Sequence, residues 1–160
     1  MRYLNSQMYS ECQLVTAINA AVYLGQPPVR LGSAEYERLV DLVGARHGSA
    51  IRINRAHRYL RLKYVDLKPE FYSIRFSLDR GMPVEIGVHS DHHGFHSALV
   101  VDVEVRGAEC VRFKVPNLRR HTDRKMWMTA KELNRILRTE SNIGPTYGYF
   151  RAFYVDEMYT

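Results

Sequence analysis

Apolar residues recur at helical spacing near the start of the chain, over residues 12–24 (CQLVTAINAAVYL). This segment is apolar almost all round, which is typical of a helix that lies in the interior of a protein. Ser10 is placed to cap its start, and Gly25 followed by Pro27 ends it. We therefore predict an interior helix whose first turn carries Cys12.

After this helix the pattern stays helical up to residue 79 and becomes strand-like from residue 83. Helices are predicted over residues 33–45, with Ser33 as cap, 54–62 and 70–79, and a later one over 129–137, opened by Thr129 in capping-box spacing. Strands are predicted over residues 83–89, 96–105, 109–115 and 147–155, with a hairpin at residues 106–108. Helices first and an antiparallel sheet second is an α+β arrangement.

Length and composition favour one domain over residues 1–160, because no linker, repeat or low-complexity tract divides the chain. No apolar run approaches the roughly 18 residues that span a membrane, and no secretory signal is visible, so no membrane contact is expected. The two cysteines, Cys12 and Cys110, do not form the pattern of a disulfide framework. We expect two free thiols in a reducing, cytoplasmic compartment.

The chain carries a formal net charge of +6, and its basic residues gather in two places. They are Arg52, Arg55, Arg58, Arg61 and Lys63 in one group, and Arg119, Arg120, Arg124 and Lys125 in the other. Such groups can attract nucleic acid or an acidic protein, or they can form a solvated face. No nucleic-acid-binding motif is present, so nucleic acid is a possible partner without support from a motif.

Cys12 has the sequence setting of a catalytic thiol. A thiol does covalent chemistry as the thiolate, so a nucleophilic cysteine needs a feature that lowers its pKa. The N-terminus of a helix supplies partial positive charge from its unpaired amides, and Cys12 lies where that charge is strongest. The alternative is a cysteine that only packs, which is how we interpret Cys110 in its alternating strand.

His96, Asn117 and Gln7 are the candidate partners of this thiol. His96 begins the most apolar predicted strand, which would hold its imidazole rigidly as the general base. Asn117 follows the next strand, so a hairpin would bring it beside His96 to orient the ring. Gln7 lies five residues before Cys12 and can supply a side-chain amide to an oxyanion hole. His93 is the second candidate for the base.

Four short motifs follow one another along almost the whole chain. They are SQ, four residues and C, leading into an Ala-rich helix that ends in YLG (residues 6–25), LDRGMPVEI (78–86), GFHSALVV (94–101) and MTAKEL (128–133). In this order they resemble the C39-type (bacteriocin-processing) cysteine peptidases and their stand-alone relatives. The resemblance implies a papain-like fold in which Cys12 is the nucleophile, His96 the base and Gln7 part of the oxyanion hole.

The sequence departs from that family at positions close to the expected site. Gln13 stands where the family usually has a Gly after the cysteine, so a bulky side chain would meet the substrate. The family's third catalytic residue is usually the Asp of an Asp-Pro pair, whereas here Asn117 follows a proline and offers the Asn of papain-type enzymes. Arg119 and Arg120 would lie with His93 on the cleft rim, where they could attract an acidic substrate.

We therefore expect a single papain-like α+β domain, with N-terminal helices packed on a C-terminal antiparallel sheet. Its expected activity is that of a cysteine hydrolase that cleaves a peptide or isopeptide bond through a thioester on Cys12, without cofactor or metal. A transferase or deamidase would use the same pair of residues. The alternative of another class is a catalytically inactive binding module whose basic rim holds nucleic acid or an acidic protein.

Overall fold

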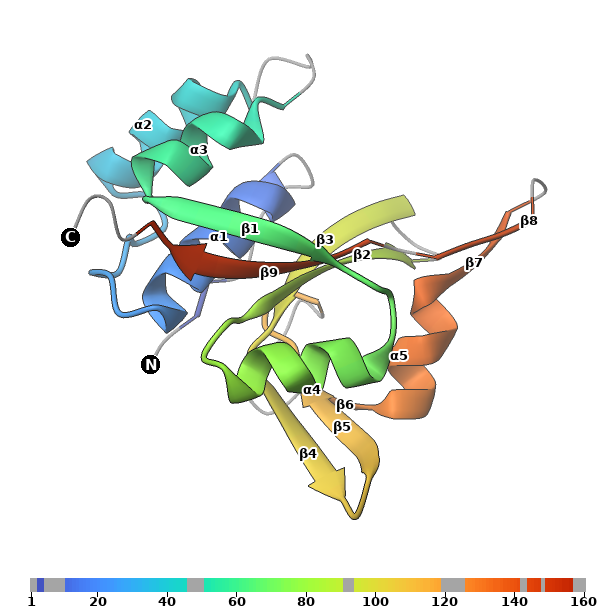
Figure 1. The fold of residues 1–160 in the computed structure, drawn as a ribbon. Helices are drawn as coiled ribbons and strands as arrows, with labels where there is room; N and C mark the ends of the chain where they lie inside the picture. Colours follow the sequence, from blue (N-terminus) through green and yellow to red (C-terminus); the bar gives the residue numbers. More distant parts are fainter. Residues whose placement is uncertain are drawn as a thin grey trace.

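The computed structural model of the protein describes residues 3–4, 11–45, 51–90, 94–118, 126–141, 144–147 and 149–156. In these ranges the chain forms a mixed α+β structure with antiparallel sheets (Figure 1). Its helices are α1 (Cys12–Tyr23), α2 (Ala34–Val43), α3 (Ile53–Tyr59), α4 (Phe71–Asp79) and α5 (Ala130–Leu137). Its strands are β1 (Leu62–Leu67), β2 (Val84–Ser90), β3 (Gly94–Val100), β4 (Asp102–Arg106), β5 (Glu109–Lys114), β6 (Trp127–Thr129), β7 (Arg138–Ser141), β8 (Gly144–Tyr147) and β9 (Phe150–Val155).

The central sheet has the strand order β1-β9-β2-β3, and every pair in it is antiparallel. Strand β1 comes from among the helices, so the expectation that the sheet is entirely C-terminal is wrong at this strand. The predicted helix over residues 54–62 ends early, at Tyr59, because Arg61 takes a left-handed conformation with φ 57° and turns the chain into β1. Only Leu62 of β1 is buried, which explains why its sequence lacks a strand-like alternation.

The predicted strand over residues 96–105 is two strands that belong to different sheets. The break is at Val101, whose backbone N–H donates to the carbonyl of Lys114 at 3.0 Å. Strand β4 then pairs with β5, and β5 with β6, in a separate three-stranded sheet. The hairpin between β4 and β5 is confirmed, with Gly107 at φ 61° in its turn. The last predicted strand starts at Phe150, later than expected, because Tyr147 ends the β7–β8 hairpin.

The helix boundaries show which caps the sequence predicted. Ser33 caps α2 by accepting the backbone N–H of Tyr36 at 3.1 Å, and Thr129 caps α5 in the same way with Glu132, so both predictions are confirmed. The Ser10 cap is wrong by one residue, because the N-cap of α1 is Glu11. The Glu11 carboxylate makes no capping bond and instead accepts the hydroxyl of Tyr36 at 2.8 Å.

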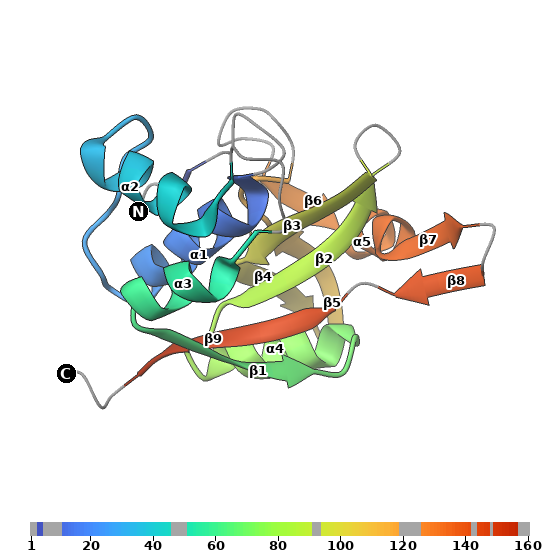
Figure 2. The same ribbon diagram turned by 90° about the horizontal axis from the view of Figure 1, so that it is seen from above.

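Two apolar clusters cover the two faces of the central sheet (Figure 2). On β3, Leu99 joins the cluster of α1, α2 and α3, whereas its neighbours Ala98 and Val100 join the cluster of α4, α5 and β5. This alternation is the period of two expected of a strand that is buried on both faces. Among the described residues, no helix has the length and apolar character needed to cross a membrane.

Candidate active site around Cys12

Cys12 is the first residue of α1, and its side chain is buried against strand β3, with 7% of the residue exposed. Burial raises the pKa of the Cys12 thiol, and the nearby charge of Glu85 raises it further. Backbone N–H groups of Ser97, Gln13 and Cys12 itself act in the opposite direction through hydrogen bonds, which lower the pKa. The thiol therefore has amide donors that would stabilise a negative charge, but burial has the largest effect and the net result is a raised pKa.

The amide that reaches Cys12 from β3 belongs to the residue next to His96. Consecutive Cα atoms lie about 3.8 Å apart, so the backbone of His96 is close to the thiol. The regular alternation along β3 places the His96 side chain with those of Ala98 and Val100, on the other side of the strand from Ser97. Strand β3 is at the edge of the central sheet, and Cys12 meets that open edge. The fold thus brings together the start of α1 and the start of β3, two segments that are more than 80 residues apart in sequence.

The imidazole of His96 is half-buried, and its Nε2 lies 2.5 Å from the carbonyl oxygen of Asn117. A carbonyl oxygen can only accept, so Nε2 carries the proton of this bond. Nδ1 is then the ring nitrogen that can take up a proton from another group. This is the tautomer that a general base needs when one nitrogen is used for orientation.

Asn117 meets His96 through its backbone rather than through its side-chain amide, which was the predicted contact. The residue is buried, with 6% exposed, and has φ 62°, a left-handed conformation that Asn adopts more readily than most residues. That conformation follows β5 and the buried Val115 and Pro116. The position of Asn117 after the strand indicated that it would approach His96. That its backbone carbonyl would make the bond could not be predicted from the sequence.

The other predicted site residues divide into one that is placed and four that are not. Gln13 lies on α1 directly after Cys12, and its side chain hydrogen-bonds the hydroxyl of Tyr149. Gln7, His93, Arg119 and Arg120 lie outside the described residues. The oxyanion role of Gln7 and the rim roles of the others therefore stay predictions.

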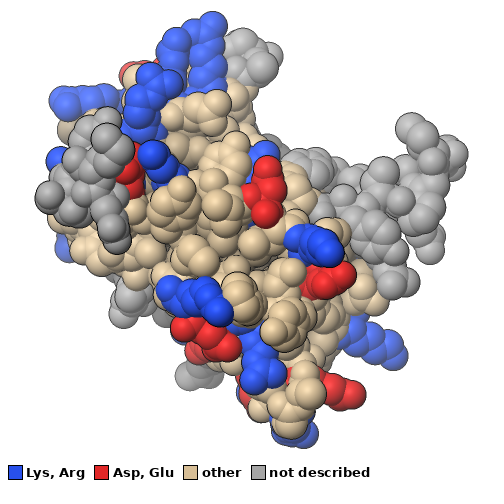
Figure 3. Space-filling model, viewed as in Figure 1, with Lys and Arg blue, Asp and Glu red and all other residues tan. Residues whose placement is uncertain are grey.

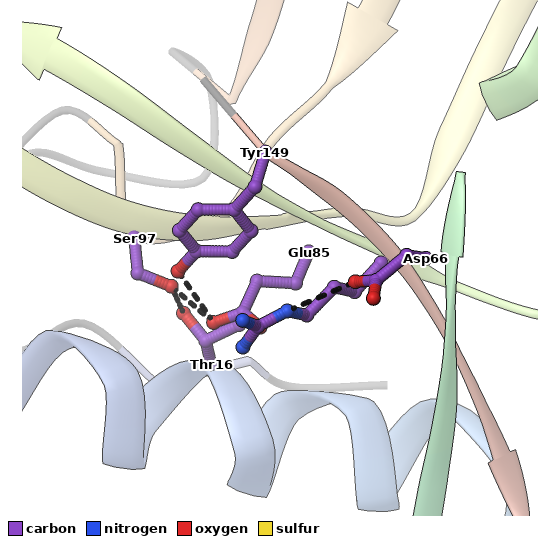
Figure 4. A network of polar contacts seen from close by, with 6 residues as sticks. Thr16, Asp66, Glu85, Ser97 and Tyr149 are labelled. Carbon is purple, nitrogen blue, oxygen red and sulfur yellow. Dashed lines mark hydrogen bonds and ion pairs between the residues drawn. The ribbon is translucent and has the colours of Figure 1, made fainter. Parts of the chain in front are cut away.

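A polar network centred on the buried Glu85 joins β2 and β3 to α1, and the sequence reasoning missed it (Figure 4). Glu85 on β2 is 2% exposed, and its Oε2 accepts the hydroxyl of Ser97 at 2.5 Å and that of Tyr149 at 3.2 Å. The Ser97 hydroxyl is also 3.3 Å from that of Thr16, one turn after Cys12 on α1. The available signal was a single carboxylate in the otherwise apolar segment PVEIGV, because a charge in a buried strand needs partners.

Two further features bear on binding. Within the described ranges, no group of three or more His, Cys, Asp or Glu side chains is placed to hold a metal ion. In Figure 3, Lys and Arg side chains gather over α2 and α3, where Arg52, Arg55 and Arg58 are exposed. The first predicted basic group is thus a surface of the molecule.

Comparison with known proteins adds no family to this geometry. No protein-family model matches the chain, and no curated protein matches it.

Proposed function

We propose that the protein is a cysteine hydrolase that cleaves a peptide or isopeptide bond, with Cys12 as nucleophile and His96 as general base in a papain-like domain. The observation that carries the proposal is the position of the Cys12 thiol at the start of α1 and at the edge of β3, beside the backbone of His96. The bond from His96 to the Asn117 carbonyl supports it, because this bond leaves Nδ1 as the proton acceptor.

In the proposed reaction, His96 Nδ1 takes the proton of the Cys12 thiol, and the thiolate attacks the carbonyl carbon of the scissile amide. The backbone N–H of Cys12 stabilises the oxyanion, together with the side-chain amide predicted for Gln7. The imidazolium of His96 then donates its proton to the leaving nitrogen, and the C–N bond breaks to leave a thioester. His96 next removes a proton from water, which hydrolyses the thioester to a carboxylic acid and restores the thiol.

The raised pKa of Cys12 defines what His96 has to do. A buried thiol is protonated at neutral pH unless a positive charge stabilises its thiolate. The proposal therefore requires an ion pair between Cys12 and protonated His96. A transferase or deamidase would need the same pair, and would differ only in the acceptor or in the amide that reacts.

Alkylation of the two cysteines tests the proposal. The protein is treated with iodoacetamide at about pH 6, where an ordinary thiol reacts slowly, and the adducts are mapped by mass spectrometry. We expect selective labelling of Cys12 over Cys110, and loss of that selectivity in His96→Ala. Cys110 is the internal control, because it is a free thiol of intermediate burial on β5.

The alternative outcome favours the second candidate, an inactive binding module. If Cys12 is not labelled preferentially, or if His96→Ala leaves its labelling unchanged, the thiol is not activated and the hydrolase proposal is wrong. The raised pKa of Cys12 and the exposed arginines of α3 favour this candidate. It predicts salt-dependent retention on a polyanion column that weakens in a variant with Arg52, Arg55 and Arg58 changed to Gln.

A further inference from the structure

Glu85 is a buried carboxyl group for which the proposed hydrolysis has no direct use. It lies on β2 in the middle of the central sheet, and 2% of the residue is exposed. Taking a carboxylate out of water costs several kcal/mol unless hydrogen bonds or charges compensate. Its Oε2 accepts two hydroxyls, whereas its Oε1 accepts no hydrogen bond from the described residues and lies 3.8 Å from Nη1 of Arg151. The surrounding structure should therefore show what a carboxyl group buried at this cost does.

The partners of Glu85 all lead to the first turns of α1. Ser97 donates to Glu85 and is also in contact with Thr16, while Tyr149 bonds both Glu85 and the side chain of Gln13. Ser97 is in addition the residue whose backbone N–H reaches the Cys12 thiol. In Figure 4 the hydroxyls of Ser97 and Tyr149 converge on the Glu85 carboxyl group beside Thr16 of the helix. The network thus joins α1 to β2, β3 and the residue before β9.

The protons of this network have two consistent arrangements. The Ser97 hydroxyl has one proton, so it cannot donate to Glu85 and Thr16 at once. When Glu85 is ionised, Ser97 donates to it and accepts from Thr16. When Glu85 is protonated, it can donate to Ser97, which then donates to Thr16. The charge state of Glu85 is therefore coupled to the orientation of hydroxyl groups within one helical turn of Cys12.

We propose that Glu85 is a positioning residue that holds Ser97 and Tyr149 against the start of α1 and whose charge opposes formation of the Cys12 thiolate. This proposal rests on the proposed role of Cys12 as nucleophile. It adds that Glu85 controls how readily the Cys12 thiol loses its proton. The thiol then responds to two groups of opposite effect, because protonated His96 favours the thiolate and ionised Glu85 disfavours it. Neutralising Glu85 removes the charge that disfavours the thiolate and leaves the effect of His96 unchanged.

The charged and titratable groups around Glu85 agree with this assignment. Cys12 faces it from α1, Tyr149 from the segment before β9, and Arg151 from β9 itself. Arg151 is shared, because its Nε lies 3.4 Å from Asp66 on β1 and its charge also acts on His57 of α3. Burial raises the pKa of the Glu85 carboxyl group, and the hydrogen bond from Ser97, the charge of Arg151 and the hydrogen bond from Tyr149 act in the opposite direction. In its ionised form, Glu85 raises the pKa values of both Cys12 and Tyr149.

Glu85→Gln separates the charge of this residue from its hydrogen bonds. The amide oxygen of Gln can still accept the hydroxyls of Ser97 and Tyr149, but the negative charge is gone. The rate of Cys12 alkylation by iodoacetamide is measured against pH by mass spectrometry. We expect the midpoint of this profile to move to lower pH by roughly one unit in Glu85→Gln. The profile of Cys110 should stay unchanged in the same samples.

Glu104→Gln is the matched control, since it makes the same change of charge on the β4–β5 hairpin, outside the network. It should leave the Cys12 profile unchanged. An unshifted or upward-shifted midpoint in Glu85→Gln, with native circular dichroism, would overturn the proposal. If Glu85→Gln does not fold, Ser97→Ala is used, because it removes a hydrogen bond that lowers the pKa of Glu85 and so favours the neutral carboxyl group. The Cys12 midpoint should then also move to lower pH, and an unchanged midpoint would overturn the proposal.

The outcome for Glu85 is distinguishable from the outcome for the hydrolase. A profile that responds to Glu85→Gln but not to His96→Ala supports the role of Glu85 and contradicts the catalytic pair. A profile that responds only to His96→Ala supports the pair and contradicts the role of Glu85. Both readouts use alkylation of the intact chain and need no substrate.

Discussion

The two faces of the central sheet are each covered by an apolar cluster, but they bury different kinds of polar side chain. On the face of α4 and α5 the core is apolar, with Ile74, Ile86 and Phe113 fully buried and Ser77 as the buried polar residue from α4. The face of α1 to α3 also buries several polar residues. These are Glu11, Thr16, Asn19, His57, Glu85 and Ser97. The comparison teaches that the α1–α3 face buries more polar groups, some of which surround Cys12 and need defined partners, whereas the other face is packed mainly by apolar side chains.

Truncating a large side chain on the apolar face should give the largest loss of stability. Phe113 is fully buried and packs against Phe71, with ring centroids 4.8 Å apart. Phe113→Ala should lower the free energy of unfolding by about 3 to 5 kcal/mol, measured by urea denaturation. Tyr72→Ala is the control on the adjacent helix, because Tyr72 is 67% exposed and its loss should change stability by less than about 0.5 kcal/mol. Comparable losses of stability for the two variants would show that Phe113 is not a core residue.

The polar face should make stability depend on pH through His57. Burial, and then the charge of Arg151, lower the pKa of His57 to about 4, while an unfolded His titrates near about 6.5. Between these pH values the unfolded chain binds the proton and the folded chain does not. Stability is therefore complete above about pH 6.5 and falls as the pH drops toward 4, by on the order of 3 kcal/mol in total.

The variant His57→Phe isolates this effect. It keeps an aromatic ring that can retain the edge contacts to Tyr64 and Phe153, which lie 5.7 and 5.2 Å away between centroids. Urea denaturation at several pH values should show a shallower slope in His57→Phe than in the unmodified protein. Equal slopes of stability against pH would mean that His57 takes up its proton in the folded protein, so that the polar face opens to water.

The smallest predicted effect comes from one hydroxyl of the network centred on Glu85. Ser97→Ala removes a hydrogen bond to Glu85 and should lower the free energy of unfolding by about 1 to 3 kcal/mol. Ser73→Ala on α4 removes a hydroxyl outside the network and serves as the comparison. A stability equal to that of the unmodified protein would show that the hydroxyl bond to Glu85 is replaced without cost.

The apolar face and most helices were readable from the sequence, whereas the polar face was not. Periodicity located α1, α2 and α4, and cap chemistry placed Ser33 and Thr129, because these signals are local. Strand β1 was not predicted because it pairs with the distant β9 and buries a single side chain. Glu85 escaped for a similar reason, since its partners are residues 12 and 64 positions away.

For the candidate site, sequence order located Cys12, His96 and Asn117 but not the atoms that meet. The position of Asn117 after β5 predicted its approach to His96, while the bond through its carbonyl depends on a left-handed backbone that tertiary structure imposes. The amide of Ser97 at Cys12 depends on how α1 meets the edge of β3. Such contacts between distant segments have no signal in the local pattern.

The central claim is that Cys12 forms an ion pair with His96, and the ultraviolet absorbance of the thiolate tests it most directly. The measurement is a pH titration of Cys110→Ser, in which Cys12 is the single thiol. We predict a thiolate signal already at about pH 6 that disappears when His96→Ala is added, because protonated His96 stabilises the charge. A thiolate that forms only at alkaline pH, with the same midpoint in both proteins, would contradict the account.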